Sequence, residues 1–261
     1  MTAKKDKLFL ITNDDGIHAR GLEALIELVR PYGRVMVIAP EDGQSGMSHA
    51  ITVKYPIRLK KLDEQKNLVV YSSNGTPVDC VKLALSKLLD RKPDMILAGI
   101  NHGSNSSSSI IYSGTMAAAI EGCINGIPSI GFSLLDYSPE ANFRSVIRYA
   151  KMILESALEK GIPLDTCLNV NFPVNTYKKI KGIRICRQNK GVWKEEFEQR
   201  LDPMNRDYFW LTGEFHNLEP KAEDTDEWAL HHNYISIVPV QVDLTDYRAM
   251  DHLRDWTIES G

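Results

Sequence analysis

Short apolar runs alternate with amphipathic segments through the first half of the chain, and this alternation limits the possible folds. Buried strands are indicated at residues 8–12 and 35–39, and further strands at 51–59, 68–71, 95–100 and 127–132. Between the first two runs, Leu22, Leu25, Ile26 and Val29 recur at helical spacing. Alternating strands and helices form a largely parallel sheet with right-handed crossovers. We therefore expect an α/β core over residues 1–165.

The pattern changes after about residue 161. Further strands are expected at 168–172, 180–186 and 234–240, and a terminal helix at 246–256. Residues 188–221 are polar, aromatic and irregular. We expect 166–261 to contain the last core elements, an extended β-rich arm and the C-terminal helix. Aromatic residues on an arm too thin for its own core favour burial against another subunit, and folding back onto the same domain is the alternative.

Composition excludes several classes of protein. The net charge of −3 provides no overall basic field that would attract a nucleic acid polymer or an anionic membrane. No apolar run is as long as a membrane span, and the N-terminal residues do not resemble a signal peptide. The four cysteines form no C-x-x-C pair, which argues against a zinc knuckle or a thioredoxin-like site. A reducing cytoplasm is the expected location.

Two adjacent carboxylates follow the first expected strand directly, in the sequence Asn13-Asp14-Asp15-Gly16. Ligands of open α/β sheets bind at this edge of the sheet. Neighbouring side chains of a strand point to opposite faces, so Asp14 and Asp15 can face one site only if the backbone turns, which Gly16 permits. Paired carboxylates suit a hard cation. A polar turn without a ligand is the alternative.

Further oxygen donors lie at other expected loops and helix starts. Ser45 and Asn101, together with the two aspartates, could bind a divalent cation that prefers oxygen. The segment Ser113-Gly114-Thr115 begins an expected helix, where free N–H groups and hydroxyls can hold a phosphate. A metal beside a phosphate site indicates phosphoryl chemistry. A plain helix cap at Ser113 and a turn at Asn101 are the alternatives.

Two common nucleotide-binding motifs do not occur in this sequence. The first strand is not followed by G-x-G-x-x-G, which argues against a dinucleotide-dependent dehydrogenase. The chain also has no G-x-x-x-x-G-K-[ST], so the mechanism of a P-loop nucleotidase has no support.

Taken in order, these motifs resemble the stationary-phase survival protein SurE family. The matching segments are Thr12–Gly16, Ala39-Pro40 with Ser45-Gly46, Gly75–Cys80, Gly99–Asn105, Ile111–Thr115 and Ala117–Gly122. The similarity is clear through about Phe132 and looser beyond it, where 224–226 and 234–239 look like the family's late segments.

The resemblance implies a Rossmann-like, mostly parallel sheet in a three-layer α/β/α core, with a C-terminal β-rich extension that mediates homodimers or homotetramers. It implies a metal-dependent phosphomonoesterase that acts on nucleoside 5′-monophosphates, and some members also cleave 3′-monophosphates or short polyphosphate. One divalent cation per subunit, Mg²⁺ or Mn²⁺, would be bound by Asp14, Asp15, Ser45 and Asn101. Both aspartates would also serve in catalysis. The positions that match the family's phosphate site are Asn105, Ser113, Gly114 and Thr115.

The sequence also departs from the family pattern. Ser106–Ser109 stand where members often have Leu-Gly-x-Asp, which leaves substrate preference open. A nucleotide-binding stress or regulatory module without turnover is the alternative function, and a metal-dependent glycosyl or nucleotidyl transferase is a third. Direct attack by water and transfer through an aspartyl-phosphate both remain open.

Overall fold

A nine-stranded sheet forms the centre of the molecule in a computed structural model that describes residues 7–138, 140–174, 179–194 and 196–256. The strand order is β3-β4-β2-β1-β5-β6-β7-β13-β8. The six strands from β4 to β7 in this order run parallel, whereas β3 and β13 pair antiparallel with β4 and β7. This arrangement confirms the mostly parallel α/β sheet expected from the sequence.

The longest connection between the described elements of the first half runs from residue 41 to residue 58, between β2 and β3. The strands of the main sheet are β1 (Lys7–Thr12), β2 (Gly33–Pro40), β3 (Leu59–Gln65), β4 (Leu68–Ser73), β5 (Met95–His102), β6 (Ser129–Leu134), β7 (Thr166–Phe172), β8 (Ile183–Ile185) and β13 (Ile235–Gln241). The α-helices are α1 (Arg20–Val29), α2 (Pro77–Leu83), α3 (Gly114–Ile124), α4 (Arg144–Lys160), α5 (Asp226–His231) and α6 (Tyr247–Leu253). Shorter helical turns are η1 (Arg30–Tyr32), η2 (Ala84–Leu88) and η3 (Ser107–Tyr112).

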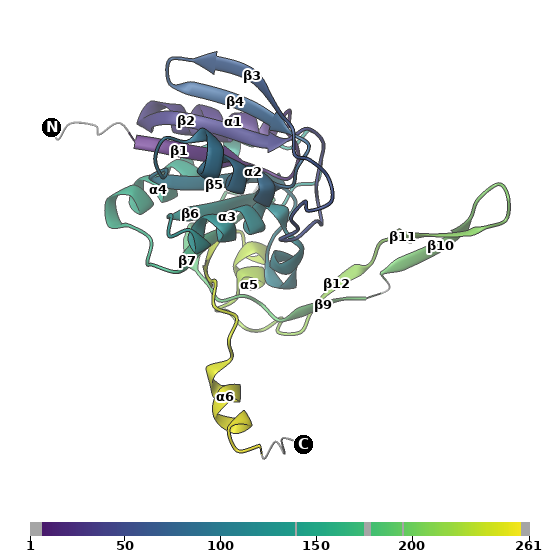
Figure 1. Ribbon diagram of the computed structural model, residues 1–261. Helices are drawn as coiled ribbons and strands as arrows, with labels where there is room; N and C mark the ends of the chain where they lie inside the picture. The colour runs from purple at the N-terminus through teal and green to yellow at the C-terminus, as the bar shows by residue number, and fades with distance from the viewer. Residues whose placement is uncertain (1–6, 139, 175–178, 195, 257–261) are drawn as a thin grey trace.

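Helices cover both faces of the sheet, which gives the three-layer core (Figure 1). Neighbouring residues of β1 show this division, because Phe9 and Ile11 pack in one apolar cluster and Leu10 packs in another. The first cluster includes the buried faces of α1 and α4, and the second includes residues of α2 and α3. Strands buried on both faces explain why the sequence shows continuous apolar runs instead of alternation.

One expected strand is wrong. Residues 51–58 form no strand, and β3 begins only at Leu59. Residues 51–58 are held by isolated hydrogen bonds instead of a strand ladder. For example, the Thr52 N–H donates to Asp79 Oδ1 at 3.1 Å. The strand β3 lies at one edge of the sheet and exposes Lys60, Lys61 and Glu64.

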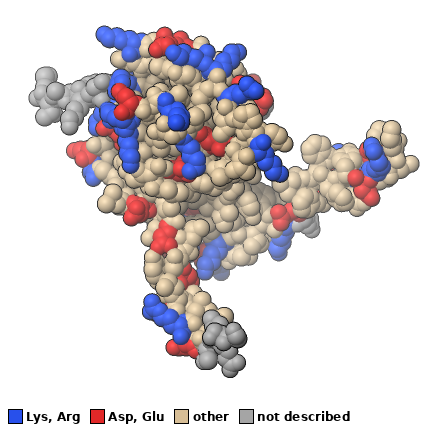
Figure 2. Space-filling model, in the orientation of Figure 1, with Lys and Arg blue, Asp and Glu red and all other residues tan. Residues whose placement is uncertain are grey.

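Residues 188–194 and 196–221 belong to the stretch whose sequence pattern is irregular and in which an extended β-rich arm was expected. They contain two pairs of strands that project from the core (Figure 1). The strands of this arm are β9 (Gly191–Lys194), β10 (Phe197–Leu201), β11 (Asp207–Leu211) and β12 (Glu214–Asn217). The strand β9 pairs with β12, and β10 pairs with β11, both antiparallel. Phe197, Phe209 and Trp210 are more than half exposed. Figure 2 shows the arm as mostly uncharged surface with scattered charged groups.

All four cysteines are buried and free. Burial raises the pKa of the Cys80 and Cys167 thiols to about 12 and that of Cys186 to about 11. These side chains therefore pack as small apolar groups. Within the described residues, no helix is both long enough and apolar enough to cross a membrane.

Candidate active site

The first carboxylate, Asp14, lies buried where β1 ends. The backbone turns at Gly16, whose φ is +101°, and the Asn13 side-chain amide donates to the Gly16 carbonyl at 2.8 Å. The hydroxyl of Thr115, in the first turn of α3, donates to Asp14 Oδ1. Burial raises the pKa of the Asp14 carboxyl to about 6, and the neighbouring Asp15 charge contributes in the same direction.

The second carboxylate, Asp15, is half-buried and lies against the end of β5. Its Oδ2 accepts a hydrogen bond from the backbone N–H of His102 at 3.0 Å. Burial raises the pKa of the Asp15 carboxyl, although the His102 N–H partly offsets this. Among the described residues, no lysine or arginine charge stabilises either carboxylate. Two adjacent carboxylates are thus held with little charge compensation, an arrangement suited to a bound cation.

The other two predicted metal ligands, Ser45 and Asn101, line the same pocket as Asp14, whereas Asp15 is not among the residues that line it. Asn101 is buried at the end of β5, and its Nδ2 donates to the Gly103 carbonyl at 3.0 Å, which leaves Oδ1 available as a ligand. Ser45 is exposed in the loop after β2, where the N–H of Gln44 donates to the Asp14 carbonyl at 2.7 Å. The pocket has a volume of about 410 Å³, within the usual range for a small-molecule site.

The donor set fits a hard cation better than zinc. It consists of two carboxylates, an amide oxygen and a hydroxyl, which are ligands that Mg²⁺ and Mn²⁺ accept. No group of three or more His, Cys, Asp or Glu side chains suited to a metal occurs in the part of the chain that the structure describes. The predicted set contains only two residues of these types, Asp14 and Asp15, and it stays a prediction.

The predicted phosphate-binding residues divide into two groups. Ser113 and Asn105 line the pocket, and Ser113 caps α3 by accepting from the Met116 N–H at 3.0 Å. The Asn105 side chain donates to Ser133 Oγ at 2.7 Å. Gly114 and Thr115 do not line the pocket, and the fully buried Thr115 directs its hydroxyl at Asp14. In this arrangement Thr115 positions a carboxylate.

The serine run connects the pocket to the late segment of the chain. The Ser107 N–H donates to Asp226 Oδ2 at 2.8 Å, and the Ser106 hydroxyl donates to the Glu227 carboxylate. Ser109 lines the pocket. The four serines therefore include two residues that dock α5 onto the core and one that faces the pocket.

Several residues that line the pocket had not been predicted to do so. They are Tyr137, after β6, together with Trp193, Glu196, Leu211 and Thr212 of the arm. The aromatic residues of the arm can be seen in the sequence, but nothing local indicates which of them would line the pocket with Asp14. His102 also lines the pocket, and its ring packs edge-on against Phe143 at 4.7 Å between centroids.

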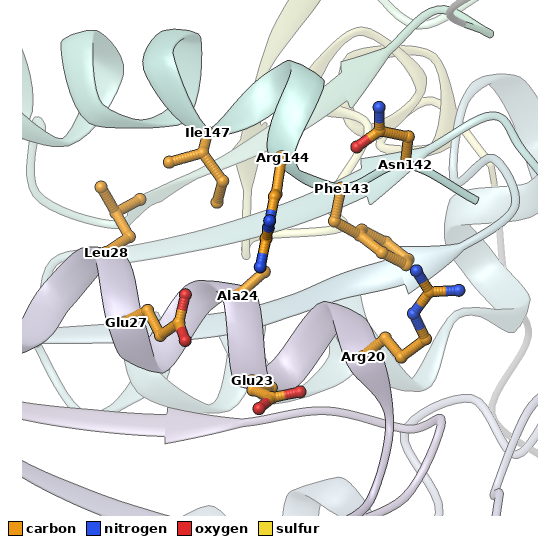
Figure 3. Close-up of a pocket in the computed structure, with 9 residues that line it drawn as sticks. All are labelled: Arg20, Glu23, Ala24, Glu27, Leu28, Asn142, Phe143, Arg144 and Ile147. Atoms are coloured by element: carbon orange, nitrogen blue, oxygen red, sulfur yellow. The ribbon is translucent and has the colours of Figure 1, made fainter. Parts of the chain in front are cut away.

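A larger pocket of about 850 Å³ lies between α1 and the start of α4 (Figure 3). Figure 3 shows Arg144 reaching from α4 toward α1, where Glu23 and Glu27 present carboxylates. Arg20, which also lines this pocket, forms an ion pair with Glu140 at 3.8 Å. None of the predicted site residues lines this pocket, so it is separate from the candidate active site.

Comparisons with known proteins agree with the motif order. A family model described as "Survival protein SurE" matches residues 9–195. A protein of Phocaeicola vulgatus named 5′-nucleotidase SurE is 50% identical over 98% of this chain and 99% of its own length. A protein of the same name from Flavobacterium psychrophilum is 52% identical over 96% and 98%. The crystal structure of the SurE protein from Aquifex aeolicus has a TM-score of 0.81 at 39% identity, covering 95% of this chain and 98% of the other.

Proposed function

Because the chain belongs to the survival protein SurE family, we propose that it is a metal-dependent phosphomonoesterase that releases phosphate from nucleoside 5′-monophosphates. It is an enzyme of the 5′-nucleotidase class, as are the relatives that share half of its residues over nearly the whole chain. One observation supports the metal dependence: the adjacent carboxylates of Asp14, which is buried, and Asp15, which is half-buried. Among the described residues, no lysine or arginine compensates their negative charge.

Asp14, Asp15, Ser45 and Asn101 are the proposed metal ligands. A bound divalent cation supplies positive charge that polarises the phosphoryl oxygens and activates water for attack. The hydrogen bonds from Thr115 to Asp14 and from the His102 N–H to Asp15 orient the two carboxylates. One aspartate accepts the proton of the attacking water. Mg²⁺ and Mn²⁺ both suit these ligands.

The start of α3 is the proposed phosphate site. Ser113 contributes its hydroxyl, because its N–H already donates to the Ile110 carbonyl at 3.4 Å. Gly114 and Thr115, which lie behind the pocket wall, contribute backbone N–H groups at the positive end of the eleven-residue helix α3, next to Asp14. Asn105 lies buried in the same pocket. These groups hold the phosphate and offset the negative charge that develops during transfer. Substrates beyond 5′-monophosphates, such as 3′-monophosphates and short polyphosphate, belong to the same proposal.

Removal of the metal is expected to stop the reaction. With Mn²⁺ present, the protein should release phosphate from AMP, and excess EDTA should lower the rate to background because the carboxylates alone do not activate water. Adding Mn²⁺ in excess of EDTA should restore the rate, as measured by a colorimetric phosphate assay. Nucleotide binding that needs no metal and leads to no release would favour a regulatory module instead, and a rate that depends on an added acceptor would favour a transferase.

The second half of the chain is proposed to mediate assembly. Residues 1–165 form the catalytic core in this proposal, and 166–261 complete the sheet and add the arm and α6. The exposed aromatic residues of the arm support burial against another copy of the chain, as a homodimer or homotetramer. Light scattering should therefore give a mass of two or four chains, and a monomeric mass would contradict the assignment. The free, buried cysteines support a reducing compartment, and we propose the cytoplasm.

A further inference from the structure

The pocket that contains Asp14 is built from two kinds of surface. Its polar side comes from the ends of the core strands and the start of α3, and includes Asp14, Asn101 and Ser113. Other parts of its wall are aromatic or apolar, from Trp193 and Leu211 of the arm. The arm also contributes the polar residues Glu196 and Thr212. If the polar side holds the phosphate, the rest of an ester bound in the same 410 Å³ lies beside this mixed wall, which includes Trp193.

The base of the arm is fixed to the core, so this wall is part of the pocket itself. The N–H of Asn189 donates to the buried Asp226 carboxylate at 2.9 Å, and the Ser107 hydroxyl donates to the Asn189 carbonyl at 3.0 Å. Gln188 also donates to the Ser107 carbonyl at 3.0 Å. These bonds hold the residues directly before β9, and therefore Trp193, against η3.

Trp193 is positioned within the arm by its partner strand. It lies opposite Phe215 of β12, and the two rings meet edge to face with centroids 5.9 Å apart. Trp193 is still 37% exposed to solvent. Because Trp193 lines the pocket as well, part of its ring is available to a ligand. Two tyrosines, Tyr112 of η3 and Tyr137 after β6, line the same pocket.

Tyr137 is held close to the strand ends. Its hydroxyl accepts from the Ser104 N–H at 3.4 Å, and Ser104 follows β5 by two residues. The aromatic rings around the pocket thus come from three separate segments: η3, the loop after β6, and the arm. Nucleobases stack on flat aromatic side chains, so aromatic residues beside a phosphate site are suited to bind a nucleotide.

We propose that Trp193 is a specificity-determining residue that stacks on the base of the nucleotide. This inference rests on the proposed function, and it extends it by assigning the leaving nucleoside to the arm side of the pocket. The ligand class is a phosphate ester with a flat aromatic base. Stacking is tolerant of base identity, so the contact favours nucleotides over aliphatic phosphate esters without selecting one base.

The test compares two esters that differ in the presence of a base. The full chain and its Trp193→Ala variant are assayed with AMP and with glycerol 2-phosphate, both with Mn²⁺. Loss of a stacked base should raise the KM for AMP by about tenfold and leave kcat within about twofold, because the contact is made equally in the ground and transition states. Hydrolysis of glycerol 2-phosphate should not change, and Trp193→Phe should recover most of the affinity for AMP.

The matched control is Trp210→Ala, which removes an exposed tryptophan of the same arm that does not line the pocket. Because exposed aromatic residues of the arm are also the proposed subunit contacts, both variants are compared at the parental mass, which light scattering measures. Calorimetric titration of adenosine into the Mn²⁺-loaded protein measures the same contact without turnover, because adenosine has no phosphate to release. A parent protein that releases no phosphate from AMP contradicts the proposed function, and the calorimetric comparison then decides on Trp193 alone. Equal adenosine affinity of the parent and Trp193→Ala, equal effects of Trp193→Ala on both esters, or the same KM change in Trp210→Ala would overturn the assignment.

Discussion

Asp14→Asn is expected to reduce phosphate release from AMP by at least about 100-fold, since loss of a group that only supports a metal ligand already costs about 10- to 100-fold. The amide keeps the size of the carboxylate, and its oxygen can still accept from Thr115. It lacks the charge that binds the cation. Activity should therefore fall because metal binding weakens, with the fold unchanged.

Stability distinguishes this result from unfolding. Burial penalises the Asp14 charge, so the free energy of unfolding of Asp14→Asn should equal or exceed that of the parent in urea denaturation. Asp79→Asn is the matched control, because Asp79 is buried outside the pocket and accepts from the Thr76 N–H at 2.9 Å. It should lower stability and leave the rate with Mn²⁺ unchanged. Parental activity in Asp14→Asn would show that the ligand assignment is wrong.

Gly21→Ala is expected to lower the free energy of unfolding by about 3 kcal/mol, the upper part of the range for overpacking a core. A Cβ atom at position 21 would lie 1.9 Å from the carbonyl oxygen of Ile100 and 3.0 Å from the Phe143 ring. The helix α1 would have to move away from β5. This strain outweighs the gain of up to about 1 kcal/mol that alanine offers over glycine within a helix.

Because Ile100 precedes Asn101, the Gly21 substitution should also disturb the site. Urea denaturation measures the first effect, and phosphate release from AMP measures the second. Gly43→Ala is the control, since a Cβ there would meet no atom closer than 3.8 Å. A Gly21→Ala protein with the parental urea midpoint would mean that α1 does not approach β5 this closely.

The core could be predicted because its determinants are local. Buried strands such as β1 and β5 are continuous apolar runs, and the buried face of α1 repeats with the helical period. The arm lacks both signals. Every residue of β10 and β11 is exposed, so their pairing depends on the partner strand and leaves no alternation in the sequence. Residues 51–58 resemble a strand in composition but have no neighbouring strand to pair with.

The site was predictable where strand ends alone determine it. β1 and β5 are parallel neighbours, so residues just beyond their ends meet at one edge, which brings Asp14 and Asn101 into one pocket. The direction of a side chain is harder to predict. Thr115, for example, was expected at the phosphate site, but its hydroxyl donates to Asp14 and the residue does not line the pocket. The position of Trp193 could not be predicted from the sequence. It depends on hydrogen bonds of Asn189 with Asp226 and Ser107, which join segments far apart in the chain.

The charged strand β3 ends the sheet on one side, and this has a consequence for how the molecules behave at high concentration. An open edge of unpaired N–H and C=O groups can recruit a strand of another molecule and start aggregation. Here an incoming strand would have to desolvate exposed lysines and acids, among them the ion pair of Lys61 with Glu64 at 2.7 Å. The charges of β3 therefore disfavour the addition of a strand from another molecule at this edge, and we expect contacts between molecules to use other surfaces.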